Sequence, residues 1–268
     1  MRVLSIDLDY ICEPAINHNN IDVRGAEENY DQWPVLKWWQ LFNDFPGEFK
    51  HDINIEYYHY CLRVYLRALR NCREVYFGYD HDNILYGLEG HTDIDIINID
   101  HHDDVFSGAF RIAEGDDSGI LNSNYERRLL EVYDRVMEGN WSLWLHTKGR
   151  LSSYTWIGDD KSENVDHIEY ANRHLPNFTY STMERYDWKD NYEFDQIFIC
   201  LSPAYIPPLQ WHMFGTFMTI YEEITGKKIN KKDLHKKYEL EYYYHGCTEY
   251  ITKGTGIGEG SSAPRIIY

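Results

Sequence analysis

With 268 residues, of which 43% are hydrophobic, the chain can form one large α/β domain with a buried core and is not disordered in composition. Its formal charge is −18, from 44 acidic and 26 basic residues, which disfavours binding to nucleic-acid phosphates and favours a cationic substrate. There is no apolar run of membrane-spanning length and no signal-peptide core, and five widely spaced cysteines indicate reduced thiols, so we expect a cytoplasmic protein that does not contact a membrane.

The first predicted element is a buried strand at 3–8 that ends in two alternating acids, Asp7 and Asp9. A carboxylate at the end of a buried strand costs desolvation free energy unless a cation or hydrogen-bond donors meet it. The pair therefore predicts a ligand site, with a solvent-exposed acidic strand end as the alternative. Residues 12–52, polar and aromatic without periodicity, predict a long insertion of the kind that forms lids or binding surfaces.

A helix is predicted at about 53–71, because apolar residues recur there at helical spacing, namely Ile55, Tyr58, Leu62, Leu66 and Leu69. A short strand at 75–77 follows and runs into Gly78-Tyr79-Asp80-His81. Glycine lets the backbone turn sharply just before a histidine. A single histidine after a strand is usually no ligand, but His81 gains interest from the carboxylates that follow it.

The strand predicted at 96–99 consists of apolar β-branched residues around one asparagine, and it leads directly into Asp100-His101-His102-Asp103-Asp104. If extended geometry persists, Asp100, His102 and Asp104 project to one side of the chain. His101 and Asp103 would then lie on the opposite face as bystanders. In open α/β sheets ligands bind beyond the carboxyl ends of strands. An isolated Asp-x-His-x-Asp run is about as often a solvated loop.

Shorter elements follow. A capping-box pattern predicts a helix from about 123 to 139, and residues 140–146 form a short element. Strands are predicted at 153–157 and 197–201, whereas the charged segment 158–192 between them is predicted to be irregular.

A helix from Pro208 to Gly226 is followed by a lysine-rich face at 227–237, interpreted as a solvated face or a site for a peptide partner. The glycines of the C-terminal arm, about 247–268, lack dinucleotide-binding spacing. The alternation of strands and helices predicts a single α/β domain over 1–268, with a largely parallel central sheet between two layers of helices.

Side chains of the types that bind metals lie at or just after the ends of three predicted strands. These side chains are Asp7, Asp9, His81, Asp100, His102 and Asp104. Carboxylates with imidazoles suit Mn²⁺, Fe²⁺ or Zn²⁺. Four carboxylates exceed what one divalent ion usually needs, so the set predicts two metal ions roughly 3.5 Å apart, bridged by shared carboxylates.

The motifs that carry these residues resemble the signature of the arginase, or ureohydrolase, superfamily. They are Gly-x-Asp-His at 78–81, Asp-x-His-x-Asp at 100–104 and Ser-x-Asp-x-Asp at 5–9. The resemblance implies an arginase-like three-layer fold with two Mn²⁺ ions and hydrolysis of a guanidino group. It also implies that His81 and Asp104 complete one metal, that His102 and Asp9 complete the other, and that Asp7 and Asp100 bridge both.

The order of the motifs departs from ordinary arginases, in which the Ser-x-Asp-x-Asp strand comes last. The permuted order, with Asn140-Trp141, Thr155-Trp156-Ile157 and Leu201-Ser202-Pro203, resembles a divergent branch that includes peptide arginases. That resemblance implies conversion of arginine side chains in a ribosomally made precursor peptide to ornithine, with release of urea. The motifs cover about a third of the chain.

By this interpretation Asp104 also orients the attacking hydroxide, and a histidine donates a proton to the leaving amine. We favour His146 among three candidates, which are His91, His101 and His146. Glu13 and Glu259 are the acids predicted to hold the guanidinium. Two alternatives remain: a metal-dependent deacetylase or amidohydrolase acting on a small amide or a free guanidino compound, and a non-catalytic peptide-binding module with a structural metal.

Overall fold

The computed structural model describes residues 1–11, 53–105, 139, 141–159, 165–189, 191–202, 206 and 210–229. Within them one sheet has the strand order β2-β6-β1-β3-β4-β5, and every pairing is parallel. The strands are β1 (Arg2–Asp7), β2 (Glu74–Gly78), β3 (Ile94–Ile99), β4 (Leu151–Gly158), β5 (Phe178–Thr182) and β6 (Gln196–Cys200). The central strands are rich in Ile, Leu and Val, as burial on both faces requires.

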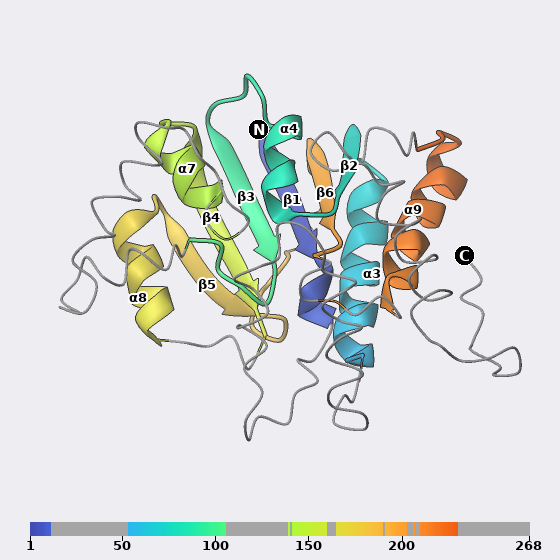
Figure 1. Cartoon of the computed structure of the whole chain (residues 1–268), viewed down its shortest axis with the longest axis horizontal. Helices are drawn as coiled ribbons and strands as arrows, with labels where there is room; N and C mark the ends of the chain where they lie inside the picture. Colours follow the sequence, from blue (N-terminus) through green and yellow to red (C-terminus); the bar gives the residue numbers. More distant parts are fainter. Residues whose placement is uncertain are drawn as a thin grey trace, which may run out of the picture.

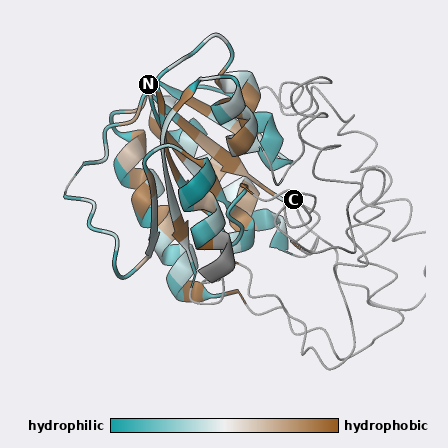
Figure 2. Ribbon diagram, turned by 90° about the vertical axis from the view of Figure 1, so that its left-hand side faces the viewer, coloured by the Kyte–Doolittle hydropathy of each residue, from teal (hydrophilic) through white to brown (hydrophobic). Residues whose placement is uncertain are grey.

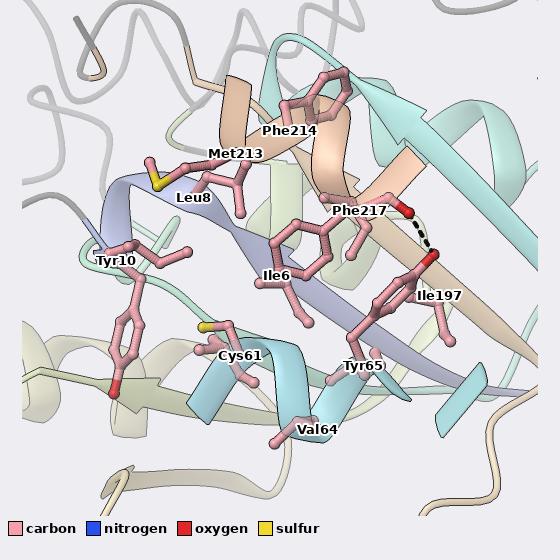
Figure 3. Close-up of a cluster of buried hydrophobic side chains, with 14 of the residues drawn as sticks. Ile6, Leu8, Tyr10, Cys61, Val64, Tyr65, Ile197, Met213, Phe214 and Phe217 are labelled. Carbon is pink, nitrogen blue, oxygen red and sulfur yellow. Dashed lines mark hydrogen bonds between the residues drawn. The ribbon is translucent and has the colours of Figure 1, made fainter. Parts of the chain in front are cut away.

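Two helices, α3 (Ile55–Leu69) and α9 (His212–Thr225), cover one face of the sheet. Figure 3 shows Ile6 and Ile197 of the strands against Tyr65 of α3 and Phe217 of α9. The Tyr65 hydroxyl donates to the Phe217 carbonyl at 3.2 Å, so the two helices are joined by a buried polar contact as well as by packing.

Three helices cover the opposite face: α4 (Ile84–Gly87), α7 (Trp141–Thr147) and α8 (Val165–His174). They pack on the alternate side chains of the same strands, among them Ile96 and Phe198. Figure 1 shows the sheet between its helices, and in Figure 2 the strands are largely hydrophobic while the helices also carry hydrophilic residues. The predicted α/β class, with a parallel sheet flanked by helices, is confirmed.

Strands β1 and β3 are neighbours in the sheet, and the helices that follow them lie on opposite faces. After β1 the chain passes through α3 on one face to reach β2, whereas the described helix between β3 and β4 is α7 on the other face. Such a switch point leaves a crevice outside the carboxyl ends of the two strands, where α/β proteins bind their ligands. Two short 3-10 helices lie at this edge, η1 (Leu8–Ile11) after β1 and η2 (His81–Asn83) after β2.

Two predictions about elements are wrong. Helix α3 exists, but Ile55 and Leu66 of its predicted apolar stripe are exposed, and the face that packs on the sheet contains Cys61, Val64 and Ala68 instead. The segment 158–192 is not irregular, because it holds α8 and β5.

Several predictions lie outside the described residues: the insertion at 12–52, the helix at 123–139, the lysines beyond residue 229 and the C-terminal arm at 247–268. Cys61, Cys72 and Cys200 are free thiols within the described part of the chain. None of the helices in that part is both long enough and apolar enough to span a membrane.

Candidate metal centre

The two acidic segments at the switch point share one local conformation. The backbone N–H of Asp9 donates to Asp7 Oδ1 at 3.1 Å, and that of His102 donates to Asp100 Oδ1 at 2.8 Å. In each segment the first aspartate caps a tight turn by bonding the backbone two residues on. The predicted extended geometry is therefore wrong here, since the strands end at Asp7 and Ile99, and a turn brings alternate side chains together instead.

His81 reaches the same edge from β2. A Cβ atom at Gly78 would lie 2.7 Å from Phe198 Cζ, so only glycine lets the end of β2 approach β6 this closely before the turn to His81. The Nδ1 atom of His81 then lies 3.1 Å from Asp7 Oδ2, 3.0 Å from Asp100 Oδ2 and 2.7 Å from Asp104 Oδ2. One imidazole nitrogen therefore faces oxygens from three carboxylates.

None of these three contacts has hydrogen-bond geometry, and His81 Nδ1 is a buried atom without a hydrogen-bond partner. The other ring nitrogen, Nε2, lies 2.7 Å from the Ser5 hydroxyl. In the tautomer that donates Nε2–H to Ser5, the Nδ1 lone pair faces three acceptor oxygens. In this state the four groups repel one another, and either a proton on Nδ1 or a metal cation between them removes the repulsion. The residues therefore fit a metal ion.

Two groups of side chains lie close enough together to hold a metal ion. Ligand atoms of Asp7, His81 and Asp100 lie within 4.8 Å of one another, and so do those of Asp9, Asp100 and His102. Asp100 belongs to both groups, as a bridging carboxylate would, whereas Asp7 belongs to the first alone. Together with Asp104 beside His81, all six predicted ligands meet at one edge of the sheet.

Burial and repulsion from neighbouring carboxylates raise the pKa values of Asp9, Asp100 and Asp104. Burial, with the charges of Asp104 and Asp7, raises the pKa of Asp100 to about 7. Burial also raises the pKa of Asp9 and of Asp104. Burial lowers the pKa of His81, but Asp104 and the other carboxylates outweigh it and hold that pKa well above its ordinary value. Without a metal the site retains protons at neutral pH, and a divalent cation would displace them.

Asp104 is held by α7. Its backbone has a φ of 51°, in the left-handed region that aspartate tolerates better than most residues. Trp141 Nε1 donates to Asp104 Oδ2 at 2.6 Å, and the Ser142 hydroxyl donates to the Asp104 carbonyl at 2.6 Å. Trp141 was part of a resemblance, but its contact with Asp104 was not predicted, because the two residues are 37 positions apart in the chain and no sequence pattern pairs them.

A second set of side chains supports Asp100. Asn98 Nδ2 donates to Asp100 Oδ2 at 3.0 Å and to the Tyr154 hydroxyl at 2.9 Å. Trp156 Nε1 donates to the Asp100 carbonyl at 3.0 Å. Such supporting hydrogen bonds orient metal ligands and fix their protonation.

His101, predicted to be a bystander, lies against a buried acid. Its Nδ1 lies 2.8 Å from Asp159 Oδ2, and its ring centre is 4.9 Å from that of the proposed ligand His102. The side chain of His101 is 23% exposed, whereas that of Asp159 is buried. Sequence analysis missed Asp159, although it directly follows β4 as Asp100 follows β3, and that position was the available signal.

The structure does not bring the other two predicted proton donors to the site. His146 is exposed in the last turn of α7, beside Arg150, whose carbonyl accepts the N–H of Ile94 at the amino end of β3. His91 lies in the turn before β3, at the same amino edge of the sheet. Helix α7 begins at Trp141 beside Asp104 and runs back along the sheet, so His146 in its last turn does not meet the six predicted ligands in the structure. Glu13 and Glu259 lie outside the described residues.

The arrangement can hold divalent cations among buried carboxylates and imidazoles, with one further acid-paired histidine at its border. Hydrolytic chemistry on a cationic group is within the capacity of such a site, because the acidic ligands attract cations and the metals activate water. Comparison of the chain with protein-family models, with curated proteins and with solved structures finds no match in any of the three.

Proposed function

We propose that this chain is a binuclear manganese hydrolase that converts arginine side chains of a precursor peptide to ornithine and urea. The observation that carries the metal centre is the buried His81 Nδ1, which faces three carboxylate oxygens without a hydrogen-bond partner. The resemblance of the three ligand motifs to the arginase superfamily supports an arginase-like fold and the choice of a guanidino group. Its permuted order supports a peptide as the substrate.

The position of the ligands gives independent support. Five of the six lie at or just after the ends of β1 and β3, on either side of the switch point in the sheet, and His81 follows β2 at the same edge. A substrate can approach the carboxyl ends of the strands there. The formal charge of −18 also favours a peptide that carries cationic arginines.

In the proposed reaction, water adds to the guanidinium carbon, the bond from that carbon to the side-chain nitrogen breaks, and the nitrogen takes up a proton. Bound Mn²⁺ would supply the nucleophile by lowering the pKa of a water molecule. Asp104, fixed by Trp141 Nε1, is placed to orient that water. Ornithine leaves as an amine, and the remaining fragment is urea.

The proton for the leaving nitrogen is assigned to His101. Of the three histidines considered, only His101 lies beside the ligands, and Asp159 holds its Nδ1 at 2.8 Å. A carboxylate in this position sets the orientation of the imidazole and stabilises its protonated form, as in acid–base dyads of other hydrolases. The partial exposure of the ring allows contact with a substrate.

Metal content and product analysis test the proposal together. We expect about two Mn²⁺ ions per chain, in line with a bridged pair of sites, and urea release from arginine-containing peptides that chelation abolishes. Acetate release from an acetyl-lysine peptide, or urea release from free arginine alone, would instead identify one of the alternative hydrolases. Tight metal binding without turnover of any of these compounds would identify a structural metal site.

A further inference from the structure

Ser202 lies directly beside the first group of ligands, just after β6. Its backbone N–H donates to the Tyr79 carbonyl at 2.8 Å, and the N–H of Leu201 donates to the Gly78 carbonyl at 3.0 Å. These two bonds join the end of β6 to the turn that presents His81. Because β6 pairs with both β1 and β2, Ser202 lies between the strands that supply Asp7 and His81.

The Ser202 hydroxyl donates to Asp7 Oδ2, the oxygen that faces His81 Nδ1 at 3.1 Å. The other oxygen, Asp7 Oδ1, accepts the backbone N–H of Asp9. Each oxygen of Asp7 therefore has a defined donor, which fixes the plane of the carboxylate. Ser202 is buried, so water does not compete for this contact.

The backbone of Ser202 has a conformation that disfavours serine. Its φ is 49°, in the left-handed region, where a residue with a Cβ atom is disfavoured and glycine is accommodated without strain. The hydrogen bond from the Ser202 hydroxyl to Asp7 is a contact that glycine could not provide.

We propose that Ser202 is a positioning residue, which holds Asp7 in the geometry that binds the metal. This inference rests on the metal centre of the proposed function. It makes Ser202 a determinant of metal affinity through Asp7, without direct contact between Ser202 and the metal or the substrate. Loss of such a supporting hydrogen bond typically lowers metal affinity by about 10- to 100-fold.

The test compares Ser202→Gly and Ser202→Ala with the full-length wild-type chain. Both variants lack the hydroxyl, and the glycine variant also relieves the left-handed backbone. Calorimetric titration with Mn²⁺ alone gives the affinity, and thermal unfolding of the metal-free proteins reports whether folding is affected. Ser153→Ala is the matched control, because it removes another serine-to-aspartate hydrogen bond, to Asp95 at 2.7 Å, near the opposite edge of the sheet.

We expect Mn²⁺ affinity to fall at least about tenfold in both Ser202 variants and to stay unchanged in the control. The metal-free glycine variant should melt no lower than the wild-type chain, which separates positioning from a general structural role. Wild-type affinity in Ser202→Gly would overturn the inference, and so would a wild-type chain that binds no Mn²⁺. Mn²⁺ binding that depends on Ser202, in a protein that releases no urea, would instead contradict only the proposed reaction.

Discussion

At the scale of single residues, buried carboxylates crowd around His81, and this crowding should disfavour the metal-free site. Asp7, Asp100 and Asp104 all direct an oxygen at one imidazole nitrogen. Like charges in a buried cluster are unfavourable until a cation neutralises them. Metal binding should therefore stabilise the fold, and removal of a carboxylate should have opposite effects with and without the metal.

Asp100→Asn separates these effects, because Asp100 belongs to both ligand groups and has a pKa raised to about 7. At pH 8 the wild-type carboxylate is charged at a cost in folding free energy, so the metal-free variant should melt at or above the wild-type temperature. With Mn²⁺ at a hundred times its Kd, the wild-type chain should gain about 2.7 kcal/mol per site, roughly 5–11 °C in Tm. The variant should lose this gain. A variant that keeps the full shift would contradict the assignment of Asp100 as a ligand.

The affinity for Mn²⁺ should rise as the pH increases. Because metal ligands bind in their deprotonated form, the raised pKa values of Asp100 and His81 mean that protons compete with the metal near neutrality. Affinity should rise as pH increases from 6 to 8, with protons released on binding. Titration calorimetry in buffers of different ionisation enthalpy measures that release. A binding enthalpy that is the same in every buffer at pH 7 would show that no protons are displaced.

His101 should affect turnover but not metal binding. His101→Asn removes the proposed proton donor and leaves the six ligands in place, so kcat should fall by about 10²-fold or more. Asp159→Asn should also lower kcat, because the His101 imidazole loses its charged partner at 2.8 Å. Mn²⁺ titration of both variants is the control and should give wild-type affinity. A kcat within threefold of wild type in His101→Asn would exclude the assignment.

At the scale of elements, the orientation of α3 is a finding that sequence periodicity did not supply. The predicted stripe consisted of Tyr58 and four aliphatic residues, whereas the face that packs on the sheet includes Cys61, Tyr65 and Ala68. Cysteine and alanine carry a weak signal in an apolar pattern, although they bury well when the opposing surface fits them. The helix itself was predictable, and its rotation was decided by packing on the sheet.

Two leucines of α3 test that rotation with identical chemistry. Leu69 is 4% exposed and lies in the core, whereas Leu66 is 38% exposed. Leu69→Ala should lower the free energy of unfolding by about 2–5 kcal/mol, the cost of a cavity in a packed core. Leu66→Ala should cost about 1 kcal/mol or less, since its side chain keeps much of its contact with water. Denaturant unfolding measures both values, and equal losses would contradict the orientation of α3.

The elements missed between 158 and 192 show a similar limit. Helix α8 buries Tyr170 and Ala171 within a charged sequence, and β5 is an edge strand with polar residues, so neither has a strong apolar period. The central strands β1, β3, β4 and β6, by contrast, carry more apolar residues and were all predicted. A strand is thus easier to predict where burial demands apolar residues than where polar residues suffice, as in β5.

At the scale of the whole molecule, the strand order explains which parts of the site were predictable. The six proposed ligands were predictable because each lies at the end of a predicted strand or in a short turn after it. The contacts of Ser202 with Asp7 and of Trp141 with Asp104 were not, because they depend on the insertion of β6 beside β1 and on the path of α7. These supporting residues come from segments far apart in the chain.

The central claim is hydrolysis of arginine within a peptide, and the mass of the peptide product tests it most directly. Peptides with one arginine in varied flanking sequences are incubated with the Mn²⁺-loaded wild-type chain, with Asp100→Asn and with a chelator as controls. The account predicts a loss of about 42 Da per converted arginine, the balance of water uptake and urea release in metal-assisted hydrolysis. Peptides of unchanged mass, in the presence of protein shown to hold its two Mn²⁺ ions, would contradict it.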